Sequence, residues 1–190
     1  MPTLLIRRRR PIGEPARPEG TTGAGRLAQA LLDLGVAIDD VRQAVIDPDG
    51  PLEQLAGAVP GDRFDVVVLG SHLVNNPDDD RRRAFLGLAV SHLADGGRLL
   101  IEHHPVDWAE TAEPTPTTPG VDPGATLGMV DVVRTPPYVS AVSVYDEGGG
   151  IVRQPFTARV LSEAELDAAL ERVGLTRRAR LGPTWLEAGR

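Results

Sequence analysis

The distribution of apolar and polar positions singles out two strands, each of which ends in a group of polar residues. Residues 64–69 form a continuous apolar run bounded by turn residues, which is typical of a strand buried on both faces. Residues 98–102 predict a second such strand. Between them, residues 79–93 carry apolar side chains at helical spacing and predict an amphipathic helix. A strand, a helix and a strand in this spacing form a βαβ unit.

The C-terminal part of the chain predicts antiparallel structure. Residues 139–145 and 151–160 alternate between apolar and polar positions on either side of a Gly-rich turn, which indicates a hairpin. Residues 162–165 form a Ser-x-x-Glu capping box that opens a helix, and Gly174 ends it. Two short strands are expected within residues 176–187.

The remaining segments carry weaker patterns. A helix is expected to begin at Gly25, and a second, weak one to cover residues 51–59. The short apolar stretches 36–38 and 43–46 are each compatible with a strand. Residues 109–127, rich in Pro and Thr, predict a loop that is either a lid over a site or a surface excursion.

Residues 1–19 combine an Arg run with several prolines and predict a basic, solvated arm. Residues 20–190 are then expected to form a single domain, because the chain is too short for two full ones.

Composition narrows the function classes. The net charge of −7 argues against a nucleic-acid partner, and the absence of Cys excludes disulfides and thiolate chemistry. No apolar run approaches the ~20 residues that span a bilayer, and the N-terminus does not resemble a signal peptide. We therefore expect a cytoplasmic protein without membrane association.

Candidate chemistry follows the two predicted strands. In an open parallel α/β sheet, ligands bind outside the carboxyl ends of the strands. The polar and aromatic residues at these two ends are Ser71, His72, Asn75, His103, His104 and Trp108. Histidine is suited to proton transfer because its pKa lies near neutrality. The spacing of these residues does not match a metal site, and no metal is expected.

Three segments together resemble class I S-adenosylmethionine-dependent methyltransferases of the small-molecule type. Residues 64–69 resemble the fourth strand of that family, and residues 93–101 its helix end, turn and fifth strand. The late helix and the terminal pair of strands resemble its antiparallel C-terminal edge. The resemblance implies an α/β, Rossmann-like fold with a mostly parallel sheet and helices on both faces, reduced at its N-terminal side.

The cofactor-binding half departs from the family pattern. The best match to the first motif is Glu19-Gly20-Thr21-Thr22-Gly23-Ala24-Gly25, which keeps the acid and two of the three glycines. By resemblance, Glu19, Gly23 and Gly25 would bind S-adenosylmethionine. The acid that binds the ribose would be Asp39, Asp40 or Asp47.

The resemblance also assigns roles at the two strand ends. Ser71 and His72 would lie along the methionine end of the cofactor, while His103, His104 and Trp108 would line the acceptor pocket. His72 or His103 is the candidate base, although a histidine here can equally serve a structural hydrogen bond. Asn75 either binds the substrate or turns the chain. Trp108 either covers a ligand or packs in the core.

The function implied is methyl transfer from S-adenosylmethionine to a small-molecule acceptor. The alternative is a non-catalytic, methyltransferase-like protein that acts as a partner subunit or a ligand-binding module, and a homodimer is compatible with either. A third alternative is that the first strand of the sheet is encoded upstream of Met1.

Overall fold

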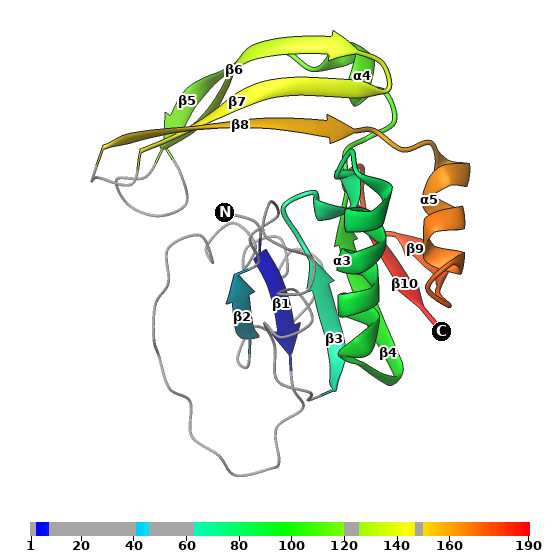
Figure 1. Ribbon diagram of the computed structural model, residues 1–190. Helices are drawn as coiled ribbons and strands as arrows, with labels where there is room; N and C mark the ends of the chain where they lie inside the picture. Colours follow the sequence, from blue (N-terminus) through cyan, green and yellow to red (C-terminus); the bar gives the residue numbers. More distant parts are fainter. Residues whose placement is uncertain (1–2, 8–40, 46–62, 120–125, 147–149) are drawn as a thin grey trace.

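The computed structural model describes residues 3–7, 41–45, 63–119, 126–146 and 150–190, which form two sheets (Figure 1). The first sheet has the strand order β2-β1-β3-β4-β10-β9. Its strands are β1 (Thr3–Arg7), β2 (Val41–Val45), β3 (Phe64–Leu69), β4 (Leu93–Glu102), β9 (Thr176–Arg180) and β10 (Trp185–Gly189). The second sheet has the order β5-β6-β7-β8. Its strands are β5 (Thr115–Pro119), β6 (Thr126–Thr135), β7 (Tyr138–Asp146) and β8 (Ile151–Arg159).

The predicted βαβ unit is confirmed. Strands β3 and β4 are parallel, with Leu69 opposite Ile101, and helix α3 (Asp79–Ser91) connects them. The side chain of Asp78 caps this helix by accepting hydrogen bonds from the first-turn amides. Strand β4 begins earlier than expected, because the Asp95–Gly97 turn is a bulge within it, where Gly96 has a φ of 72°.

The expectation of a mostly parallel sheet is wrong for the described strands. The β3–β4 pair is parallel, and the other four pairings of this sheet are antiparallel. Strand β1 lies between β2 and β3 and runs opposite to both, so that Leu4 pairs with Leu69 and Arg7 with Val66. The physical reason is that apolar periodicity predicts a buried strand but not the direction of its neighbour.

The prediction of a solvated arm over residues 1–19 is wrong for Thr3–Arg7, which form β1 within the sheet. The Leu-Leu-Ile run there has strand propensity that the adjacent Arg run obscured. Residues 43–46 were expected to be a short strand, and β2 covers most of them. The expected helices at Gly25 and at 51–59 and the strand at 36–38 lie outside the described residues.

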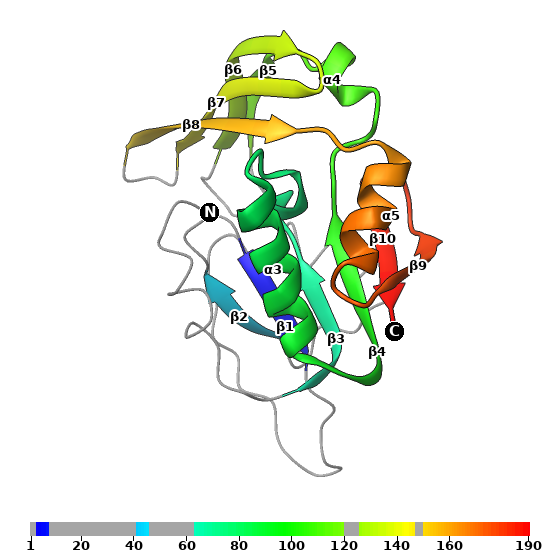
Figure 2. The ribbon, with the colours of Figure 1, turned by 45° about the vertical axis from the view of Figure 1, so that its right-hand side comes forward.

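Helices α3 and α5 (Glu163–Glu171) cover the same face of the first sheet (Figure 2). Phe85 of α3 and Leu170 of α5 belong to one apolar core with sheet residues such as Leu69 and Ile101. The expectation of helices on both faces is therefore not met by the described residues. Helix α5 opens with the predicted capping box, and Gly174, with a φ of 76°, follows its end.

The second sheet replaces much of the predicted loop. Residues 109–127 contain the end of the short helix α4 (Trp108–Thr111), strand β5 and the start of β6. Strand β5 was not predicted because its prolines are typical of loops. It accommodates them because it is an edge strand, where a missing N–H is tolerated. The hairpin of β7 and β8 is confirmed. Figure 1 shows this sheet above the carboxyl ends of β3 and β4, while β9 and β10 form the predicted antiparallel edge of the first sheet.

Candidate functional site

The chain turns sharply where β3 ends. Ser71 and His72 have φ values of 55° and 53°, so two consecutive non-glycine residues adopt the left-handed conformation. This conformation costs about 1–2 kcal/mol per residue and persists only where the surroundings hold it. A 3-10 turn, Leu73–Asn75, follows directly and is buried. The turn projects the His72 side chain toward the end of β4.

Glu102, the last residue of β4, contacts this turn with both carboxylate oxygens. Its Oε2 accepts a hydrogen bond of 2.6 Å from the backbone N–H of Ser71. Its Oε1 lies 3.7 Å from Nε2 of His72. The two side chains are 25% and 31% exposed respectively, so the pair lies at the border of the interior.

The ring of His72 is the first of three stacked rings, followed by those of His104 and Trp108. The imidazoles of His72 and His104 have centroids 3.9 Å apart and an interplanar angle of 14°. The other face of the His104 ring packs against Trp108, with ring centroids 3.7 Å apart and an interplanar angle of 6°. The stack connects the end of β3, the end of β4 and the start of α4 through flat apolar faces.

His103 is buried, with 3% of its surface exposed. Its Nδ1 lies 2.9 Å from the carbonyl oxygen of His104, and its backbone N–H donates to Thr184. Within the described part of the chain, Nε2 of His103 and Nδ1 of His72 are buried without a hydrogen-bond partner. Two orphaned ring nitrogens at one edge of the sheet are polar atoms that a ligand would satisfy.

The pKa values of all three histidines are lowered. Burial is the largest cause for each. For His104, burial together with the neighbouring imidazoles of His72 and His103 lowers the pKa to about 2, so its ring is neutral at physiological pH. For His72, the Glu102 carboxylate opposes burial by raising the pKa. His72 is thus the histidine of the stack that a carboxylate helps to protonate.

Asn75 binds the protein's own backbone. It is 2% exposed, its amide nitrogen donates to the carbonyl of Arg159, and its amide oxygen accepts from the N–H of His104, both at 2.9 Å. These bonds join the two sheets at the site and correspond to the structural alternative for this residue.

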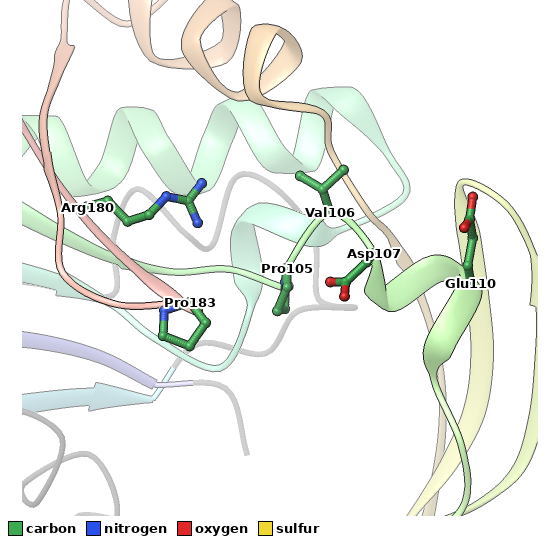
Figure 3. Close-up of a pocket in the computed structure, with 6 residues that line it drawn as sticks. All are labelled: Pro105, Val106, Asp107, Glu110, Arg180 and Pro183. Carbon is green, nitrogen blue, oxygen red and sulfur yellow. The ribbon is translucent and has the colours of Figure 1, made fainter.

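A hollow of about 460 Å³ lies beside the end of β4 (Figure 3). It is lined by Pro105, Val106, Asp107, Glu110, Arg180 and Pro183. Its volume is within the range of small-molecule sites. The lining segment 105–107 directly precedes Trp108 in the sequence, whereas none of the three stacked rings lines the hollow.

The structure brings together the candidate residues that follow the two strands: Ser71, His72, Asn75, His103, His104 and Trp108. The cofactor candidates Glu19, Gly23, Gly25 and Asp47 lie outside the described residues. Glu102 was not singled out as a site residue from sequence, where its position as the last residue of a buried strand was the available signal.

No group of three or more metal-ligating side chains gathers within the described ranges. None of the described helices is long and apolar enough to cross a membrane.

No protein-family model matches the sequence, and no curated protein is significantly similar to it. Among solved structures, the chain is similar to an S-adenosylmethionine-dependent methyltransferase from Clostridium acetobutylicum ATCC 824. The identity is 12%, the match covers 85% of this chain and 67% of that one, and the TM-score is 0.52.

Two further matches have lower TM-scores. The sugar N-methyltransferase KedS8 from Streptoalloteichus sp ATCC 53650 is 17% identical, with 70% and 58% of the chains covered and a TM-score of 0.48. CalS10, an amino pentose methyltransferase from Micromonospora echinaspora, is 20% identical, with 70% and 61% covered and a TM-score of 0.45. The chain spans 58–67% of the length of these three structures. The first match defines the fold class: an α/β fold like that of S-adenosylmethionine-dependent methyltransferases.

Proposed function

We propose that the protein transfers a methyl group from S-adenosylmethionine to a small-molecule acceptor. The observation that carries the proposal is the cluster of His72, Glu102, His104 and Trp108 at the carboxyl ends of the parallel pair β3 and β4. Ligands of open α/β sheets bind at this edge. The methyltransferase-like fold gives the cluster its chemical context.

The described residues fit one side of a cofactor site. The orphaned nitrogens of His72 and His103 offer polar atoms to a ligand, and the Ser71–His72 turn would lie along its methionine end. Glu19, Gly23, Gly25 and Asp47 would contribute the remainder. When bound, the cofactor supplies an electrophilic methyl group on its sulfonium.

The protein's own part in the reaction is alignment and proton removal. We assign proton removal to His72 in preference to His103. His72 is partly exposed and faces a carboxylate, whereas His103 is buried and one of its nitrogens is engaged by a carbonyl. The hollow lined by residues 105–107, which precede Trp108 in the sequence, is a suitable size for the acceptor.

Calorimetric titration of the full chain with S-adenosylhomocysteine tests the proposal first. Binding in the micromolar range is expected, followed by methyl transfer in a screen of amine and hydroxyl acceptors. His72→Gln is expected to retain binding and lose transfer, because the base acts on the acceptor. Glu113→Gln, an exposed carboxylate away from the cluster, is the matched control and should change neither. Absence of binding by a folded chain contradicts the proposal.

A further inference from the structure

We propose that Glu102 is a positioning residue, which holds the Ser71–His72 turn and stabilises the proton that His72 accepts. The inference rests on the proposed function, since it gives His72 the part of the base. It extends that function to a residue that acts through its contacts with Ser71 and His72 rather than on the substrate itself.

The first argument is geometric. The two oxygens of Glu102 have separate tasks, one on the N–H of Ser71 at 2.6 Å and one toward Nε2 of His72 at 3.7 Å. The hydrogen bond to a charged acceptor stabilises a left-handed turn that a non-glycine sequence does not favour. Glu102 thereby fixes the backbone from which the His72 side chain projects.

The second argument concerns the orientation of the ring. The face of the His72 imidazole lies against His104, and His104 lies against Trp108. The stack sets the plane of the ring, and the carboxylate lies near its Nε2. These contacts restrict both the tilt and the rotation of the ring, which is the pre-organisation that a general base requires.

The third argument is electrostatic. Among the described residues, the titratable groups that act on His72 are the Glu102 carboxylate and the imidazoles of His103 and His104, whose pKa values are lowered. Burial lowers the pKa of His72 and Glu102 raises it. When the acceptor gives its proton to Nε2, its electron pair stays on the acceptor, and the new imidazolium lies 3.7 Å from a carboxylate. Glu102 therefore favours the state that follows proton transfer.

Glu102→Gln tests this inference, because glutamine keeps an acceptor oxygen for Ser71 and removes the charge. NMR titration of the four imidazoles in the full chain, without cofactor, should show the His72 midpoint moved to lower pH. The acidic limb of the pH–kcat profile should move in the same direction, and kcat should fall about ten- to a hundredfold. Glu102→Asp should restore most of the His72 midpoint, since it restores the charge.

The outcomes separate the two proposals. Loss of activity with neither the midpoint nor the pH profile moved overturns the inference, since Glu102 would then be a structural residue only. A moved midpoint with an unmoved profile also overturns it, because His72 would not be the base. Absence of S-adenosylhomocysteine binding by wild type contradicts the proposed function, and with it the catalytic role of Glu102, whereas the imidazole titration still reports the coupling itself.

Discussion

The amide nitrogen of Asn75 donates a 2.9 Å hydrogen bond to the carbonyl oxygen of Arg159, which ties the end of β3 to the end of β8 across 84 residues of sequence. The amide oxygen of the same side chain accepts from the backbone N–H of His104. One buried asparagine therefore holds the two sheets and both strand ends of the candidate site in register.

Asn75→Ala should destabilise the protein by about 1–3 kcal/mol, because it leaves the partly buried N–H of His104 and carbonyl of Arg159 without this partner. Urea unfolding measures the change. Asn76→Ala is the matched control, since the Asn76 side chain accepts an exposed hydrogen bond from the Asp78 N–H, whose loss should cost about 1 kcal/mol or less. Equal losses for the two variants would contradict the structural role of Asn75.

Asp79 pairs with two arginine side chains. It contacts Arg82, which is only 4% exposed, and lies 3.1 Å from Arg159. Burial lowers the pKa of Arg82, and Asp79 opposes this shift. Asp79→Asn should cost about 1–2 kcal/mol of unfolding free energy, because the buried guanidinium of Arg82 loses one of its counter-charges, while the 67% exposure of the Asp79 side chain screens the pair.

Asp80→Asn is the control for that prediction. Asp80 occupies the same first turn of α3 and pairs with Arg83, but both side chains are well exposed. Its loss should cost no more than about 0.5 kcal/mol beyond the helix-dipole effect that both variants share. Similar unfolding midpoints for the two variants would argue against a stabilising role for Asp79.

The ring stack should make stability sensitive to acid. The pKa of His104 falls from 6.5 to about 2 on folding, so between these values the unfolded chain binds more protons. Stability is therefore fully present above about pH 6.5 and decreases as the pH falls, by at most about 1.4 kcal/mol per pH unit from this residue. His72 and His103 act in the same direction.

His104→Phe keeps a flat ring in the stack and removes this titration. Unfolding free energies measured from pH 7 to pH 5 should show a shallower dependence for the variant than for wild type. Parallel curves would show that His104 titrates normally in the folded chain.

Gly97 is required by close backbone approach. A Cβ at this position would lie 2.9 Å from the carbonyl oxygen of Ala94 and 3.2 Å from that of Asp65. Gly97→Ala should therefore destabilise the bulge in β4 by about 1–3 kcal/mol. Gly87→Ala, in α3 with open space around the new methyl group, should instead stabilise by about 0.5–1 kcal/mol. Thermal unfolding of both variants distinguishes these opposite signs.

The sequence was sufficient for elements whose pattern is local. Residues 64–69 and 79–93 carry their own periodicity, and Ser162 with Glu165 carries a capping signal, so β3, α3 and α5 follow from neighbouring residues. The histidines at the strand ends were predicted as candidate site residues because they directly follow these elements in the sequence. By contrast, β1 and β5 are short, and Arg or Pro residues beside or within them masked the pattern.

Contacts between distant segments were not predictable. The role of Glu102 depends on the left-handed turn at Ser71 and His72, which is 31 residues earlier in the chain. The hydrogen bonds of Asn75 depend on where the end of β8 lies relative to the ends of β3 and β4, which the predicted hairpin did not determine. Both cases involve long-range pairing, which local propensity does not encode.

The directions of β1 and β10 place Thr3 and Gly189 at opposite ends of the strands of the first sheet. Because Leu4 pairs with Leu69 and Arg7 with Val66, β1 starts at the edge of the sheet that carries His72. Strand β10 runs away from that edge, with Trp185 opposite Glu102 and Ala188 opposite Leu99. Any peptide fused before Thr3 would emerge beside the histidines, whereas one fused after Gly189 would emerge at the far end of the sheet. Affinity tags for the binding and titration experiments therefore belong at the carboxyl terminus.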